Sequence, residues 1–238
     1  MLNRRLLGLI CSYKRVGTVD RLKNNAEKVI KYPTRENLEF RTMRKGEEGS
    51  VAQLFVKGFV KNLSYITSKE EFPSLEKFYK KSFEYDEENR KNFLVAYHTV
   101  EKRIIAICRI RDSNRVEKNL PISVMFKMLS AKTVLGLLCT FGSFDLLNKQ
   151  IVENEQIIEF LTVCGKHKGK DLGRTMMQCM ESVGKERNAS KLSMVVHAEE
   201  ERALKMYESE GYKITHIIHS LKSVTFGNKV SFKMEKAI

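Results

Sequence analysis

The sequence predicts an α/β protein in which strands and helices alternate along the chain. Three observations lead to this class. Short runs with an apolar residue at every second position alternate with longer runs whose apolar residues recur at helical spacing. Two runs rich in apolar and β-branched residues, 92–99 and 102–111, lie close enough to predict a hairpin. Residues 157–182 have the pattern of a strand, a turn rich in glycine and cations, and a helix.

Length and composition indicate one sizeable globular domain, alone or with an extension. The chain has 238 residues, of which 42% are hydrophobic and 30% are charged, as is ordinary for a soluble protein. The net charge of +14 is compatible with nucleic acid, an anionic membrane or a phosphate-rich ligand. The lysines are spread along the chain and the motifs of nucleic-acid binding are absent, so we expect no nucleic-acid partner.

The first 36 residues are predicted to be an N-terminal extension that ends near Pro33. This stretch is basic, with no acidic residue before Asp20, and its apolar run of residues 6–10 is too short to span a membrane. A mitochondrial presequence has this composition, and so does an ordinary helix packed on the domain. The second interpretation is favoured, so we expect a cytoplasmic protein, with a mitochondrial location as the alternative.

The cysteine pattern indicates reduced thiols and no metal site. The count of five is odd and includes no CxxC pair, and no histidine has metal-ligand spacing to a cysteine. We therefore expect buried thiols inside the cell and no bound metal. The five residues are Cys11, Cys108, Cys139, Cys164 and Cys179.

The elements before the hairpin are a strand and two helices. Residues 38–44 alternate between apolar and polar, as in a strand. Residues 47–63 place Val51, Phe55 and Phe59 on one helical face, and residues 74–83 form a second helix that Ser74 caps.

An insertion at about 113–150 follows the hairpin. Its predicted helices, 121–129 and 132–138, end near Gly142, and each carries an apolar stripe. We expect these stripes to cover the sheet; the alternative is a lid over the acceptor pocket. Two further strand–helix units, a strand at 157–164 with a helix from 171, then a strand at 191–197 with a helix at 200–211, precede the closing strands 212–221 and 229–235.

The turn between the strand and helix of residues 157–182 has the features of an anion site. The first amides of a helix have no internal partner and carry partial positive charge. Gly169 and Gly173 allow the backbone to approach a ligand, and Lys168, Lys170 and Arg174 add full charges. Such a turn suits a pyrophosphate. The glycine spacing fits neither a Walker loop nor a dinucleotide fingerprint.

This stretch resembles the acetyl-coenzyme A loop of the GNAT superfamily of N-acetyltransferases. In that family a strand ending in Val precedes Arg/Gln-x-x-Gly-x-Gly/Ala and a helix; here Val163 precedes residues 168–173, with Lys168 for Arg/Gln and Asp171 for the first glycine. A second stretch fits the family pattern Val-x-x-x-Asn-x-x-Ala-x-x-x-Tyr-Glu-x-x-Gly-Phe/Tyr, with Glu200 in place of Asn. Its matching residues are Val196, Ala203, Tyr207, Glu208, Gly211 and Tyr212.

The resemblance implies a mixed, mainly antiparallel central sheet flanked by helices, in a domain of residues 37–238. The cofactor strand and the next strand would splay apart and admit acetyl-coenzyme A as co-substrate, with no metal. The residues that would bind it are Leu161, Thr162, Val163, Lys168, Gly169, Lys170, Asp171, Leu172, Gly173, Arg174, Glu200 and Ala203.

The implied reaction is direct attack of a primary amine, on a small molecule or a peptide, at the thioester. Tyr207 stands at the family's acid position, and a phenol is protonated at neutral pH. Glu159 is the candidate base, with His197 as a second candidate, while His167 is expected to serve phosphate binding. A non-catalytic coenzyme A-binding module is the alternative function, a basic nucleic-acid-binding protein is a weaker one, and a homodimer is left open.

Overall fold

The computed structural model describes residues 35–85, 87–112, 120–147, 154–169, 171–219 and 230–238. In these residues seven strands form one sheet in the order β1-β2-β3-β4-β5-β7-β6. The strands are β1 Leu38–Thr42, β2 Phe93–His98, β3 Arg103–Asp112, β4 Glu155–Val163, β5 Lys191–His197, β6 Lys213–His219 and β7 Val230–Ala237. All neighbours are antiparallel except β4 and β5, which are parallel. The predicted class, a mixed and mainly antiparallel sheet flanked by helices, is confirmed.

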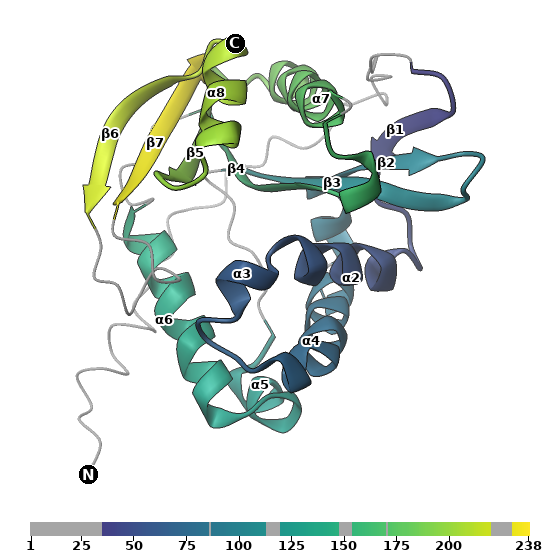
Figure 1. Ribbon diagram of the computed structural model, residues 1–238, viewed down its shortest axis with the longest axis vertical. Helices are drawn as coiled ribbons and strands as arrows, with labels where there is room; N and C mark the ends of the chain where they lie inside the picture. The colour runs from purple at the N-terminus through teal and green to yellow at the C-terminus, as the bar shows by residue number, and fades with distance from the viewer. Residues whose placement is uncertain (1–34, 86, 113–119, 148–153, 170, 220–229) are drawn as a thin grey trace, which may run out of the picture.

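Helices lie on both faces of this sheet (Figure 1). Helices α7 and α8 cover one face, which we call the α7 face, and the others lie on the opposite α2 face. The helices are α2 Glu48–Gly58, α3 Val60–Leu63, α4 Phe72–Tyr85, α5 Ile122–Met128, α6 Ala131–Leu147, α7 Leu172–Glu186 and α8 Glu201–Ser209, with 3-10 turns at Lys69–Glu71, Glu87–Asn92 and Gly165–His167. No helix in these ranges is long and apolar enough to cross a membrane.

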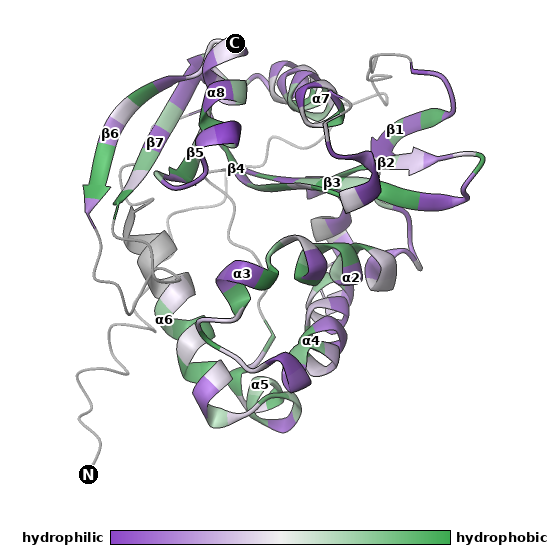
Figure 2. Ribbon diagram, viewed as in Figure 1, coloured by the Kyte–Doolittle hydropathy of each residue, from purple (hydrophilic) through white to green (hydrophobic). Residues whose placement is uncertain are grey.

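Each face of the sheet has its own hydrophobic core. On the α7 face, Met176 and Met180 pack against Ile105 and Leu192. On the α2 face, Val51 and Leu75 pack against strand residues that include Phe93 and Val95. Figure 2 shows that α4 and α7 each carry both hydrophobic and hydrophilic residues, as expected for helices that pack one side on a sheet. The two cores hold the central strands β3 and β4 from both sides.

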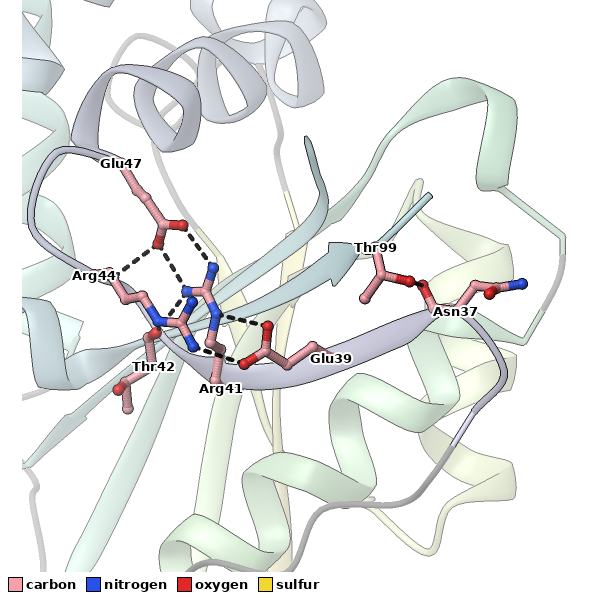
Figure 3. Close-up of polar contacts among 7 residues, drawn as sticks. All are labelled: Asn37, Glu39, Arg41, Thr42, Arg44, Glu47 and Thr99. Carbon is pink, nitrogen blue, oxygen red and sulfur yellow. Dashed lines mark hydrogen bonds and ion pairs between the residues drawn. The ribbon is translucent and has the colours of Figure 1, made fainter. Parts of the chain in front are cut away.

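An arginine on β1 fixes the start of α2 (Figure 3). Arg41 donates two hydrogen bonds to the Glu47 carboxylate, of 2.8 and 2.6 Å, and its Nε lies 3.3 Å from Glu39. The Arg44 amide adds a third hydrogen bond to Glu47, of 2.8 Å. Burial raises the pKa of the Glu47 carboxyl, but the Arg41 and Arg44 hydrogen bonds outweigh it and lower that pKa overall. The charged form therefore holds helix and strand together.

The helix predicted over residues 47–63 is interrupted at Phe59. Its backbone angles, φ −110° and ψ 20°, leave the helical region, so α2 ends at Gly58 and α3 begins at Val60. Glycine favours such a break because of its low helix propensity. The Phe59 ring packs against Phe55 and Phe160, with ring centroids 4.9 and 5.9 Å apart. The break thus turns the chain toward strand β4.

The insertion forms the two predicted helices, but α6 is longer than expected and runs through Gly142 to Leu147. It is supported by α4 and by the segment before α4: a Cβ on Gly136 would meet Ile66 Cβ at 2.6 Å, and Glu71 accepts hydrogen bonds from Ser130 and Thr133. The insertion therefore extends the helical layer of the α2 face, and its apolar residues Met125, Val134 and Leu137 belong to the same core as the strand residues of that face. Its segments 113–119 and 148–153, and nearly all of the predicted extension 1–36, lie outside the described residues.

Candidate active site

Strands β4 and β5 pair over only part of their length. Their parallel ladder joins Glu155–Ile158 to Lys191–Met194. Beyond it, β4 pairs only with β3 and β5 pairs only with β7 among the described residues. The edge of β4 that faces β5 is thus without a strand partner along residues 159–163, which include Leu161, Thr162 and Val163. An extended ligand can use such an edge as an added strand does.

A bulge lies where the two strands part. Arg109 pairs with Phe160 and Ile110 pairs with Ile158, so Glu159 is the extra residue of β4. Bulges bend a strand and increase its twist, which accounts for the departure of β4 from β5. The Glu159 carboxylate forms ion pairs with Arg109 and, at 3.0 Å, with Arg111. The Arg109 guanidinium stacks 5.3 Å from the Phe93 ring, which places this ion cluster on the α2 face.

The turn after β4 leads directly into the first turn of α7. Cys164 still bonds to Ile105 of β3, through a 2.7 Å hydrogen bond from its amide. Gly169 and Asp171 then take positive φ angles of 79° and 53°, which only glycine adopts without strain and asparagine or aspartate tolerates. The Thr175 amide is the first of α7 to bond back, to the Asp171 carbonyl at 3.0 Å. The preceding amides, of residues 172–174, donate to no carbonyl in the described part of the chain.

The charged side chains of this turn differ in what they contact. Lys168 is exposed, and Asp171 is exposed without capping the helix through its side chain. Arg174 instead reaches α8, where its Nε lies 2.9 Å from Glu210 and its Nη2 donates to Ser209 at 3.2 Å. Leu172 is buried in the α7-face core. Lys170 lies outside the described residues. Within the described part of the turn, Lys168 is an exposed cation, and the helix dipole adds partial positive charge at the start of α7.

Close packing against α8 favours glycine at position 173, in addition to the predicted role of Gly173 in cofactor binding. A Cβ at this position would lie 3.1 Å from Met206 Sδ on α8, which is tighter than ordinary contact. The close approach holds the start of α7 against α8. Ala203, also predicted to bind the cofactor, is half-buried against the same core, and Glu200 begins α8 by accepting the Leu204 amide at 3.0 Å.

Tyr207 lies on the α7 face near the parted strands. Its side chain is 8% exposed, and its ring centroid is 6.2 Å from that of Tyr212. Burial raises the pKa of Tyr207, and the neighbouring Cys108 and Glu200 raise it further, so the hydroxyl is protonated at neutral pH. Within the described residues this hydroxyl makes no hydrogen bond. Tyr207 belongs to the same core as Leu161 and Val163 of β4, and its hydroxyl carries a proton that it could donate.

His197 ends β5 on the opposite, α2 face. Its Nδ1 lies 2.9 Å from Oγ of Ser231, its partner in the β5–β7 ladder. Sequence reasoning missed Ser231, because the register that places it beside His197 depends on a long-range strand pairing. It also missed Lys61 of α3, whose Nζ lies 3.3 Å from Glu199 in the loop between β5 and α8.

His167, expected near phosphates, contacts the β2–β3 turn instead. Its Nε2 lies 3.0 Å from Glu101, and its ring centroid is 5.6 Å from that of His98. These side chains line a cavity of about 240 Å³ beside Leu172. No group of three or more His, Cys, Asp or Glu side chains with metal-binding geometry occurs within the described ranges.

The parted strands and the amides at the start of α7 agree with the expectation drawn from the sequence motifs. A comparison of the chain with models of protein families decides which family it belongs to. The acetyltransferase (GNAT) family matches residues 60–212. The chain belongs to this family. It is accordingly an acyltransferase of the acetyl-coenzyme A-dependent N-acetyltransferase class. No curated protein matches this acetyltransferase.

Solved structures with the same fold are distant in sequence. PaiA N-acetyltransferase from Thermoplasma acidophilum, solved with coenzyme A, is 15% identical with a TM-score of 0.53, over 84% of this chain and 99% of that chain. Ribosomal-protein-S5-alanine acetyltransferase from Vibrio fischeri is 11% identical with a TM-score of 0.56, over 86% and 94%. The C-terminal condensation domain of Ebony, with β-alanyl-dopamine, is 11% identical with a TM-score of 0.61, over 84% and 99%. The acetyltransferase thus shares their fold.

Proposed function

We propose that this acetyltransferase transfers the acetyl group of acetyl-coenzyme A to a primary amine by direct attack. The opening between β4 and β5 carries the proposal, because it joins an unpaired strand edge to an unpaired helix N-terminus. An acyl carrier with an amide-bearing arm and a pyrophosphate has matching groups for both. The backbone of Leu161, Thr162 and Val163 would bind the arm, and the amides of residues 172–174 with Lys168 would bind the pyrophosphate.

Acetyl-coenzyme A supplies an activated thioester carbonyl. In the reaction the amine nitrogen forms a bond to the carbonyl carbon, the carbon–sulfur bond breaks, and the sulfur leaves as a thiolate. Tyr207 would give its hydroxyl proton to that sulfur, since its raised pKa keeps the hydroxyl protonated at neutral pH. The proton lost by the amine needs an acceptor on the other side of the opening. Glu159 is the base predicted from the sequence.

Ligand binding is tested first, by the thermal stability of the protein. Acetyl-coenzyme A at about 100 times its Kd should stabilise the fold by about 2.7 kcal/mol. Lys168→Glu should raise the Kd for acetyl-coenzyme A at least about tenfold, and so reduce this stabilisation, since it puts a negative charge near the N-terminus of α7. Lys127→Glu on α5, which makes the same change of net charge on another exposed lysine, is the control. If acetyl-coenzyme A stabilised both variants equally, the turn after β4 would not be the pyrophosphate site.

Catalysis is tested next, by thiol release with a panel of primary amines and short peptides. Release that depends on the acceptor supports the enzyme, whereas a thermal shift without release supports the non-catalytic coenzyme A-binding module. The fold does not select the acceptor, because acetyltransferases with this fold bear names that specify different acceptors, ribosomal-protein-S5 alanine and spermidine. A small-molecule or peptide acceptor, a cytoplasmic location and a homodimer stay predictions.

A further inference from the structure

We infer that the imidazole of His197 takes the proton from the attacking amine, with Ser231 holding the ring in place. This assignment of a base rests on the proposed acetyl transfer. It replaces Glu159 in that role and is carried by the position of His197 on the sheet, by its hydrogen bond, and by the charged groups around it.

His197 and Tyr207 flank the opening from opposite faces of the sheet. Side chains alternate along β5, so Val196 packs into the α7-face core while His197 points to the α2 face. Tyr207 belongs to the α7-face core. A proton donor for the sulfur and a proton acceptor for the nitrogen are thus separated by the gap in which the acyl carbon would lie. Such a separation suits direct attack, because the amine nitrogen loses its proton and the sulfur gains one at two different atoms bound to that carbon.

The hydrogen bond to Ser231 fixes the orientation of the ring. Ser231 is 2% exposed and faces His197 in the β5–β7 ladder, with Nδ1 and Oγ 2.9 Å apart. In the tautomer that carries its proton on Nδ1, the ring donates to Ser231 and leaves the Nε2 lone pair for the amine proton. Ser231 acts through His197 and is a positioning residue.

The surroundings favour a neutral ring that can still accept a proton. Burial lowers the pKa of His197, Glu200 and Glu199 from the β5–α8 loop oppose that effect, and Lys61 from α3 adds to it. The ring is therefore uncharged at neutral pH, as a base must be. When it takes the proton, the two carboxylates stabilise the charge.

Glu159 is poorly suited to the same task. Its carboxylate is ion-paired to Arg109 and Arg111, and all three side chains are less than a quarter exposed. A proton on this carboxylate would break both pairs and leave two guanidinium charges without their carboxylate. The contacts suit a residue that holds the β4 bulge in shape.

The test compares His197→Gln with His216→Gln, a control histidine that is exposed on β6. At saturating acceptor, using the amine of the panel that reacts fastest, His197→Gln should lower kcat about 100-fold or more and leave the Kd for acetyl-coenzyme A within about twofold. The wild-type kcat should fall at low pH with a midpoint below about pH 6.5, and His197→Gln should lose that dependence. Ser231→Ala should lower kcat less than His197→Gln does, and it should shift the pH at which kcat falls to half. His216→Gln should behave as wild type.

Other outcomes would overturn the assignment in distinct ways. If His197→Gln retains kcat within about threefold and keeps the acid limb, the inference is wrong. If Glu159→Gln instead loses the fall of kcat at low pH, the base is Glu159. If His197→Gln has a lower melting temperature, His197→Ala with added imidazole decides: regained thiol release supports the base, and no regain opposes it. Acetyl-coenzyme A binding by a wild-type protein that releases no thiol with any amine would remove the proposed function itself.

Discussion

The backbone of Gly58, the last residue of α2, lies against the Thr162 side chain of β4. The three atoms nearest to a Cβ at position 58 all belong to Thr162, and that Cβ would overlap its hydroxyl group. Thr162 is 7% exposed and lies on the stretch of β4 that pairs with β3 but, among the described residues, not with β5. The end of α2 therefore supports β4 at the point where the proposed ligand would bind.

Gly58→Ala should consequently destabilise the fold by about 1–3 kcal/mol and weaken acetyl-coenzyme A binding, since the added methyl must displace β4. Urea unfolding and the thermal shift measure the two effects. Gly49→Ala in the same helix is the matched control, because its nearest neighbour would be Lys80 Cδ at 3.7 Å. This control should gain up to about 1 kcal/mol from helix propensity. Equal stability of both variants would contradict the close approach.

Tyr207→Phe should lower kcat about 100-fold while leaving the Kd for acetyl-coenzyme A and the stability almost unchanged. The lost hydroxyl makes no hydrogen bond within the described residues, so its removal should not weaken folding. Tyr212→Phe is the control: its hydroxyl is buried without a hydrogen-bond partner in the described structure, and its side chain belongs to the same core as Tyr207. Thiol release that is normal in Tyr207→Phe would exclude the acid role.

Asp171→Gly should tighten acetyl-coenzyme A binding and raise stability slightly. Asp171 has φ 53°, which costs a residue with a Cβ roughly 1 kcal/mol, and its carboxylate stands beside the proposed pyrophosphate site. Asn188→Gly separates the relief of backbone strain from the loss of the negative charge. Asn188 has a similar φ of 56°, but it is uncharged and follows the other end of α7. We expect a similar gain of stability in both variants, and tighter binding in Asp171→Gly only. Isothermal titration and thermal unfolding would measure these changes.

Glu71→Gln should destabilise the protein by about 1–2 kcal/mol at neutral pH, because Glu71 ties the start of α6 to the segment before α4. Burial raises the pKa of Glu71, but hydrogen bonds from the Ser130 amide, Thr133 and Thr67 outweigh it and lower the pKa to about 2. A lowered pKa stabilises the fold above about pH 4.5 and loses that effect as the pH falls toward 2. The difference in the free energy of unfolding between wild type and Glu71→Gln should therefore shrink as the pH falls from about 4.5 toward 2. Glu208→Gln on α8, an exposed carboxylate, should show no such difference.

Local patterns predicted most elements of the fold from the sequence. Strand β5 was predicted at its observed bounds, and the hairpin and α4 differ by one or two residues at their ends, because periodicity fixes an element better than its limits. The break at Phe59 was not predicted, since the helical pattern continues through it and the Phe59 ring packs against Phe160 of a distant strand, a contact that no local pattern specifies. The position of the insertion on α4 was missed for the same reason.

The candidate site divides in the same way. The turn from Lys168 to Gly173 was predicted because its chemistry is contiguous in sequence, and its positive φ angles agree with the glycine and aspartate there. The partners of Arg174, Glu159 and His197 come from α8, β3 and β7, and no local signal specifies them. These tertiary contacts are what distinguishes His197 from Glu159 as a base.

The short ladder between β4 and β5 has a mechanical consequence. Within the described residues, four ladder pairs join β1–β4 to β5, β7 and β6, so a ligand that paired with β4 beyond them would add strand contacts at the edge of this short ladder. Amide hydrogen exchange along residues 159–163 should then slow when the ligand binds. Free coenzyme A has the same arm as acetyl-coenzyme A. In the proposed binding mode its release would break the same contacts, so we expect product dissociation to limit turnover.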